Sequence, residues 1–164
     1  MSDQTQSDQT QSDQTQTDRT QIDDRPTYDT VAVGDVLPGR GFTLRRADLV
    51  RYAGASGDFN PIHWNPRFAT EVGLPDVIAH GMLTMGTVVS VATDWCGDAA
   101  AVVEYGTRFT KPVVVPDGEA GAVVAVAGVV AAKDDDRRVV RIDLTATCGD
   151  DKVLGRTQVF VRLP

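Results

Sequence analysis

The stretch GMLTMGTVVSVATDWC, residues 81–96, is apolar around most of its circumference when it is drawn as a helix. Its polar positions Thr84, Thr87 and Ser90 form only a thin stripe. A helix that is hydrophobic nearly all round is typical of a protein interior. Its β-branched residues have low helix propensity, so burial has to stabilise it, and Gly97 is a natural stop. This stretch predicts one buried central helix.

The segments that follow this helix have the character of β-strands. Apolar and polar residues alternate along 101–111, 139–148 and 153–163, which indicates strands with one buried face. The run 121–132, GAVVAVAGVVAA, is small and β-branched, and it fits a strand that is covered on much of both faces. Turn-forming Pro, Gly and Asp residues separate these segments. We therefore expect four consecutive strands in an antiparallel meander.

Upstream of the helix, 41–46 suits an opening strand and 47–53 suits a short helix. One buried helix against a long antiparallel sheet is an α+β arrangement.

The chain opens with three SDQTQ repeats over residues 2–16, and no apolar residue lies between Met1 and Ile22. Such a segment cannot bury enough surface to offset the entropy of ordering. It also lacks the apolar core of a secretory signal and is acidic, unlike a transit peptide. We therefore expect a disordered acidic tail over 1–28, which either recruits a partner or only solubilises the chain, and a single domain over 29–164.

Composition excludes several classes of function. The net charge of −7 argues against non-specific nucleic-acid binding, and no apolar run is long enough to span a bilayer. Cys96 and Cys148 are far apart and form no CxxC pair, so two buried free thiols are expected rather than a zinc site or a disulfide. We expect a cytoplasmic protein that neither binds nucleic acid nor inserts into a membrane.

A second stretch, GASGDFNPIHWNP (54–66), bears on the chemistry. A regular helix or strand would point Asp58 and His63 in different directions. Pro61 and Gly57 favour irregular backbone instead, which allows the two side chains to converge. A carboxylate beside an imidazole can hold water or move a proton near neutral pH. The same residue types also form ordinary turns, so a plain loop is the alternative.

Gly81, at the start of the expected central helix, offers a second feature. The N-terminus of a helix presents free N–H groups and the positive end of the helix dipole. Without a Cβ at Gly81, a substrate carbonyl could approach such an N–H closely, as in an oxyanion hole. The alternative is that the glycine only permits tight packing. His80, directly before it, is expected to be a packed or hydrogen-bonded residue.

Three ordered segments resemble one family. YAGASGDFNPIHWNPRFA (52–69) resembles the signature of the MaoC-like (R)-specific hydratases and dehydratases. AHGMLTMG (79–86) is similar to the start of that family's central helix, and YGTRFTKPV (105–113) to its following strand. Within the family, the resemblance is greatest to the B subunits of mycobacterial-type (3R)-hydroxyacyl-ACP dehydratases. It implies a hot-dog fold, in which a long antiparallel sheet wraps around one buried central helix.

The resemblance also implies roles for residues. Asp58 and His63 match the family's catalytic pair, Gly81 matches its carbonyl-binding amide, and Asn60 matches an asparagine that shapes the substrate-binding loop. Some members carry a serine eight residues after the glycine, but this chain has Val89 there, so no serine role is expected. Neither a metal nor a cofactor is implied.

The implied reaction is the reversible dehydration of (3R)-3-hydroxyacyl thioesters to trans-2-enoyl thioesters in fatty-acid elongation, with mycolic-acid elongation as a narrower case. The substrate would be carried by an acyl carrier protein or by CoA. A non-catalytic acyl-binding hot-dog subunit and a hot-dog thioesterase are the alternatives. We expect a heterodimer with a related hot-dog subunit, or otherwise a homodimer. Four basic residues either meet an acidic carrier protein or form a solvated face: Arg108, Lys111, Arg137 and Arg138.

Overall fold

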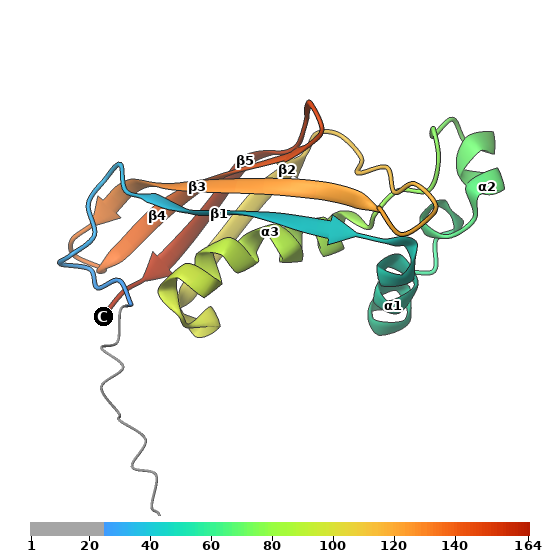
Figure 1. Cartoon of the computed structure of the whole chain (residues 1–164). Helices are drawn as coiled ribbons and strands as arrows, with labels where there is room; N and C mark the ends of the chain where they lie inside the picture. Colours follow the sequence, from blue (N-terminus) through green and yellow to red (C-terminus); the bar gives the residue numbers. More distant parts are fainter. Residues whose placement is uncertain (1–24) are drawn as a thin grey trace, which may run out of the picture.

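A five-stranded antiparallel sheet carries one long helix, α3, along one of its faces (Figure 1). The computed structural model describes residues 25–164. In chain order the elements are β1 (Val36–Leu44), α1 (Arg46–Ser56), the 3₁₀ helix η1 (Pro61–His63), α2 (Pro66–Glu71), α3 (Gly81–Cys96), the 3₁₀ helix η2 (Ala99–Ala101), β2 (Val102–Phe109), β3 (Ala122–Asp134), β4 (Val139–Cys148) and β5 (Asp151–Arg162). The predicted α+β arrangement is confirmed.

Helix α3 covers the predicted segment, and one of its faces packs against the sheet. The buried residues of the helix are Thr84, Val88, Val91, Ala92 and Cys96. Gly97 ends the helix in the left-handed conformation, with φ of 69°, as predicted. The opposite side of the helix is only partly covered, and Met82 is 58% exposed. The predicted central helix is therefore confirmed, although in the single chain the sheet covers only one side of it.

The order of strands in the sheet is β1-β3-β4-β5-β2. Strands β3, β4 and β5 form the predicted antiparallel meander, but β2 pairs with β5 instead of β3, with Tyr105 opposite Val159. The expectation of four strands in one meander is therefore wrong at its first connection. Residues 110–121 lie between β2 and β3, and this connection is too long for the 2–5-residue loop of an ordinary hairpin.

Two strands differ in detail from the expectation. Burial alternates along β3, where Val124 is buried and Val123 is exposed; coverage of both faces is therefore wrong, because within the chain α3 covers only one side of the sheet. Strand β1 begins at Val36, earlier than expected. A register shift between Leu37 and Arg40 accommodates Pro38 and Gly39 within the strand.

The N-terminal boundary of the domain lies before residue 29. Residues 1–24 of the predicted tail lie outside the described residues, but 25–28 are described, and Tyr28 is only 5% exposed. Its backbone N–H donates to the carbonyl of Pro164 over 3.0 Å, and its hydroxyl donates to Asp135 over 2.6 Å. The expectation that residues 25–28 belong to the tail is therefore wrong, because Tyr28 binds the C-terminal residue and the β3–β4 turn through hydrogen bonds.

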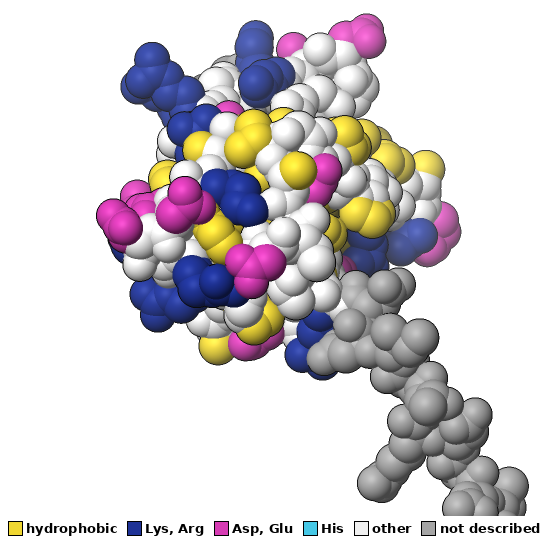
Figure 2. Space-filling model, turned by 90° about the vertical axis from the view of Figure 1, so that its left-hand side faces the viewer, with side chains coloured by type: hydrophobic (Ala, Val, Ile, Leu, Met, Phe, Trp, Pro, Cys, Tyr) yellow, Lys and Arg dark blue, Asp and Glu magenta, His cyan; other side chains and the backbone are white. Residues whose placement is uncertain are grey.

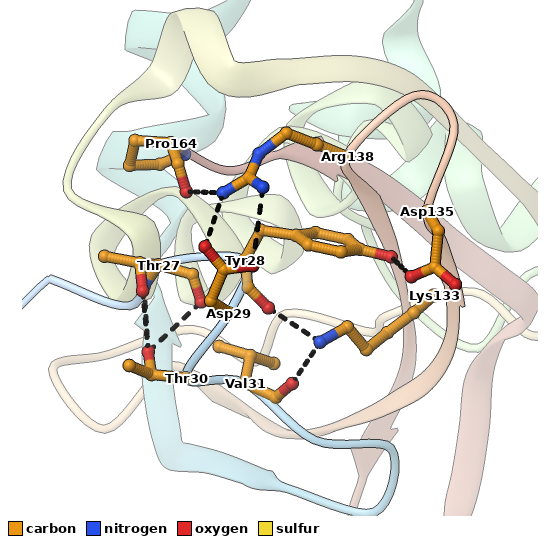
Figure 3. A network of polar contacts seen from close by, with 9 residues as sticks. All are labelled: Thr27, Tyr28, Asp29, Thr30, Val31, Lys133, Asp135, Arg138 and Pro164. Carbon is orange, nitrogen blue, oxygen red and sulfur yellow. Dashed lines mark hydrogen bonds and ion pairs between the residues drawn. The ribbon is translucent and has the colours of Figure 1, made fainter.

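Figure 3 shows the polar network around this contact. The Nζ of Lys133 donates to the carbonyls of Tyr28 and Val31, each over 2.6 Å. The guanidinium of Arg138 donates to the carboxylate of Asp29 and to the carbonyl of Pro164. Figure 2 looks onto this end of the molecule, where basic and acidic side chains lie interspersed. The network joins the N-terminal segment to the β3–β4 turn and to the last residue of the chain.

Cys96 and Cys148 are free thiols, as predicted, but only Cys96 is buried, and Cys148 is partly exposed. Within residues 25–164, no helix combines the length and the hydropathy needed to cross a membrane.

Candidate active site

The loop between α1 and α2 reverses direction through a short series of local hydrogen bonds. Gly57 ends α1 with φ of 75°, in the left-handed region that favours glycine. The backbone N–H of Asn60 donates to Oδ1 of Asp58 over 3.2 Å, and Oδ1 of Asn60 accepts from the N–H of Ile62. Pro61 occupies the first turn of η1, where a missing N–H costs nothing.

This loop brings the two predicted catalytic side chains together. Nε2 of His63 lies 3.9 Å from Oδ2 of Asp58. The imidazole is only 7% exposed, whereas the carboxylate is 52% exposed. The pair therefore stands at a boundary between the protein interior and solvent, as a group that exchanges protons with a bound molecule requires.

The hydrogen bond of His63 determines which of its ring nitrogens can accept a proton. Nδ1 lies 2.7 Å from the carbonyl of Ile78. Because a carbonyl only accepts, Nδ1 carries the hydrogen. In the neutral imidazole, Nε2 then holds the free lone pair, on the side that faces Asp58.

His80 lies directly beneath this pair, at the N-cap of α3. It is 1% exposed, and its ring stacks on that of His63 with centroids 3.7 Å apart and an angle of 24° between the planes. Burial lowers the pKa of His80, and the nearby positive charge that His63 can carry lowers it further, against opposing effects from Asp58. His80 is therefore held in its neutral form more firmly than an ordinary histidine.

A cavity of about 410 Å³ opens beside His63. Most of its lining is apolar, and its residues are Ile62, His63, Ile78, Ala79, Gly81, Thr84, Phe109, Thr110, Lys111, Pro112, Val113, Val153 and Leu154. Gly81 begins α3, so the cavity adjoins a helix N-terminus whose first N–H groups have no partner within the helix. An acyl thioester has the matching chemistry: an apolar chain and one carbonyl that needs a donor.

The four predicted site residues separate into two groups. His63 and Gly81 line the cavity, and Asp58 stands beside His63. Asn60 is not among the cavity-lining residues that the structure describes, and its side chain caps η1. Its geometry favours the shaping of the loop over direct contact with a ligand.

Sequence reasoning missed most of the cavity wall. Thr84 lies one turn after Gly81, and its hydroxyl donates to the carbonyl of His80 over 3.3 Å; its spacing from Gly81 was a usable signal. Phe109 and Lys111 come from the end of β2 and the segment after it. Ser90, beside the family's serine position, donates to the carbonyl of Thr87 within its own helix.

Asp58, His63 and His80 also form a group whose possible ligand atoms lie within 4.8 Å of one another. A metal bound by histidine lies in the plane of the ring, about 2 Å from the nitrogen. The two imidazole planes are nearly parallel and their centroids are 3.7 Å apart, so their in-plane lone pairs do not converge on one ion. The geometry therefore fits proton transfer better than metal binding.

The MaoC like domain family matches residues 13–147 of the chain. The chain belongs to this family. The (R)-specific enoyl-CoA hydratase of Rhodospirillum rubrum is 36% identical over 121 residues, covering 73% of this chain and 81% of the relative. The 3-hydroxybutyryl-CoA dehydratase of Methylorubrum extorquens is 33% identical over 122 residues, covering 74% of each. The names of these relatives agree with the predicted hydro-lyase class.

Two further similar proteins are longer than this chain. The 3-hydroxyacyl-thioester dehydratase X of Mycobacterium tuberculosis is 43% identical over 88 residues, which are 54% of this chain and 30% of that protein. A solved MaoC-like dehydratase is 42% identical with a TM-score of 0.82, covering 85% of this chain and 43% of the other. The chain thus spans less than half the length of these two proteins. The structural match confirms the predicted hot-dog fold.

Proposed function

We propose that this MaoC-like chain catalyses the reversible removal of water from (3R)-3-hydroxyacyl thioesters, which gives trans-2-enoyl thioesters. The observation that carries the proposal is the 3.9 Å contact between His63 and Asp58, beside a largely apolar cavity that also contains Gly81. The names of the relatives from R. rubrum and M. extorquens support the same chemistry.

In the dehydration direction, the thioester carbonyl accepts a hydrogen bond from the N–H of Gly81 at the start of α3. This contact stabilises the negative charge that develops on the oxygen when C2 loses its proton. The free lone pair on Nε2 of His63 accepts that proton. The bond between C3 and the hydroxyl oxygen breaks, and the hydroxyl leaves as water with a proton returned by the Asp58–His63 pair. The pair therefore ends in its starting protonation state.

A thioesterase on the same fold would attack the thioester carbonyl with water and would release free CoA. A non-catalytic acyl-binding subunit would do neither. The purified chain, alone and with a co-encoded hot-dog neighbour, is incubated with crotonyl-CoA while enoyl absorbance and free thiol are followed. The proposal expects loss of absorbance without thiol release. Thiol release would establish the thioesterase instead, and no change in either signal would leave only the acyl-binding subunit.

The chain works with a second hot-dog subunit. Within one protomer, β2 is an edge strand, and the outer side of α3 is open at Met82; such edges are normally paired or covered. Two solved structures that share this fold are complexes: ChsH1–ChsH2 of M. tuberculosis (23% identity, TM-score 0.71) and HadBC of M. tuberculosis (18% identity, TM-score 0.63). A heterodimer is favoured over a homodimer.

Light scattering on the chain, with and without its neighbour, tests this pairing. A heterodimer that turns over long-chain enoyl thioesters faster than the chain alone supports it. A stable homodimer with equal activity on long chains contradicts it.

The thioester carrier is an acyl carrier protein or CoA in the cytoplasm. Exposed Lys111, which also lines the cavity, is placed to meet an anionic carrier. Arg138 lies in the polar network at the other end of the molecule and is paired with Asp29 over 3.0 Å, so it fits a structural role better.

A further inference from the structure

His80 touches both members of the catalytic pair, although it is not itself part of that pair. Its Nε2 lies 3.1 Å from the backbone carbonyl of Asp58, and its ring stacks face to face on the ring of His63. These contacts join the N-cap of α3 to Asp58, before η1, and to His63, the last residue of η1. The side chain is 1% exposed, so water does not compete for them.

The hydrogen bond to Asp58 defines the tautomer of His80. A backbone carbonyl only accepts, so Nε2 carries the hydrogen. Nδ1 is buried and has no hydrogen-bond partner among the described residues. In the neutral ring that atom is a bare acceptor, but in a protonated ring it would be a buried donor without an acceptor, which is costly.

The surroundings of His80 also favour the neutral form. The titratable groups that face it are Tyr52 from α1, with ring centroids 4.8 Å apart, Asp58 from the loop and His63 from η1. From α3 itself, the hydroxyl of Thr84 donates to the backbone carbonyl of His80 and adds no charge. Of these groups, only Asp58 favours a charged His80, through the hydrogen bond to its backbone carbonyl and through its half-exposed carboxylate, and burial outweighs both.

We propose that His80 is a positioning residue that holds the backbone of Asp58 and the ring of His63 while it remains an uncharged Nε2–H tautomer. The inference rests on the proposed function, since it concerns the proton transfers of the same site. His63 becomes positively charged when it accepts the C2 proton. A neutral aromatic face can stack against that cation, whereas a charged imidazole 3.7 Å away would repel it.

Two substitutions separate the two contacts. His80→Phe keeps an aromatic face beneath His63 but removes the hydrogen bond to Asp58. His80→Gln keeps an N–H donor at a similar reach but removes the stacked ring. Because a small misplacement of reacting groups costs up to about 10²-fold in rate, kcat should fall by about tenfold or more in each variant. KM should change much less, because His80 does not line the cavity.

The matched control is Val88→Ala, which removes buried apolar volume from the same helix at a residue outside the cavity lining. It should lower the melting temperature without lowering kcat per folded molecule. If the folded Phe and Gln variants keep kcat at the level of this control, the positioning role is wrong. If kcat falls only in the Phe variant, the hydrogen bond to Asp58 positions the pair and the stacked ring does not. If kcat falls only in the Gln variant, the stacked ring positions the pair and the hydrogen bond does not.

The tautomer is measured separately on the wild-type protein without substrate. The chain has two histidines, so isotope-labelled histidine gives two sets of ring signals, and the Phe variant assigns them. At about pH 6, where an ordinary histidine is largely protonated, His80 should remain a neutral Nε2–H ring. A protonated His80 at that pH overturns the inference. A wild-type protein that fails to hydrate crotonyl-CoA overturns the proposed function instead, so the two failures are distinguishable.

Discussion

Gly81 and Phe109 face each other so closely that a Cβ on Gly81 would lie 3.1 Å from Cε1 of the Phe109 ring. Both residues line the cavity. Phe109 is half exposed, so its ring can shift for one methyl group, but a methyl group on Gly81 would still occupy space in the cavity that both residues line. The absence of a side chain at Gly81 therefore serves the cavity as well as the helix start.

Gly81→Ala is expected to fold and to lower kcat for crotonyl-CoA hydration by about tenfold or more, since loss of an oxyanion-hole contact costs about 10²–10³-fold. Gly81→Val should have a larger effect. Gly86→Ala in the same helix is the matched control, because a Cβ there meets no described atom within 4 Å; it should keep full activity and gain stability from its helix propensity. If the Gly81→Ala and Gly86→Ala variants are equally active, Gly81 does not bind the thioester carbonyl.

Asn60→Ala should lower both stability and turnover, because it removes the side-chain acceptor for the N–H of Ile62. The loss of such a cap costs about 1 kcal/mol. Asn65→Ala provides the comparison, since Asn65 caps α2 in the same way through the N–H of Phe68. Thermal unfolding should shift by a similar amount in both variants, and kcat should fall only for Asn60→Ala. A parallel fall in kcat for both would show that Asn60 has no special role in placing Asp58 and His63.

The truncation of residues 2–24 should leave the melting temperature and turnover unchanged, because this segment is polar throughout apart from Ile22. Truncation of residues 2–28 removes buried Tyr28 and its bonds to Pro164 and Asp135. Removal of a large buried aromatic side chain costs about 3–5 kcal/mol. Denaturant unfolding of both truncated proteins measures the difference, and equal stability would contradict a clamping role for Tyr28.

The predictability of the molecule from its sequence differs between local and long-range features. Helix α3, Asp58 and His63 could be found because their signals lie within short segments. The position of β2 beside β5 could not be predicted, because strand order depends on contacts between segments that are distant in the sequence. The place of Phe109 and Lys111 in the cavity wall was missed for the same reason, since the cavity forms only when the end of β2 meets the start of α3.

Tyr28 shows a different limit. It follows a polar repeat, so its sequence context resembles the tail. Its burial depends on Lys133 of β3, Asp135 of the β3–β4 turn and Pro164 at the C-terminus, and no local pattern predicts those contacts.

Stability should fall as the pH rises from about 10 towards 12. Burial, together with the hydrogen bond to Asp135, raises the pKa of Tyr28 from 10.0 to about 12. The unfolded chain therefore loses this proton at a lower pH than the folded chain, and unfolding becomes more favourable across that window. Burial also raises the pKa of Tyr105 to about 12, so part of the loss should remain when Tyr28 is replaced. Tyr28→Phe should make the fall in unfolding free energy shallower, and an unchanged slope would contradict the burial of this hydroxyl.

The most direct test of the proposed chemistry is the rate of crotonyl-CoA hydration by Asp58→Asn and His63→Ala, measured with the subunit partner that supports wild-type turnover. A general acid or base contributes about 10²–10⁴-fold, so each variant should lose at least about 10²-fold in kcat while its circular dichroism spectrum is retained. Asp94→Asn, which removes an exposed carboxylate paired with Arg40, should keep the wild-type rate. A folded Asp58→Asn or His63→Ala variant that hydrates crotonyl-CoA at nearly the wild-type rate would contradict catalysis by this pair.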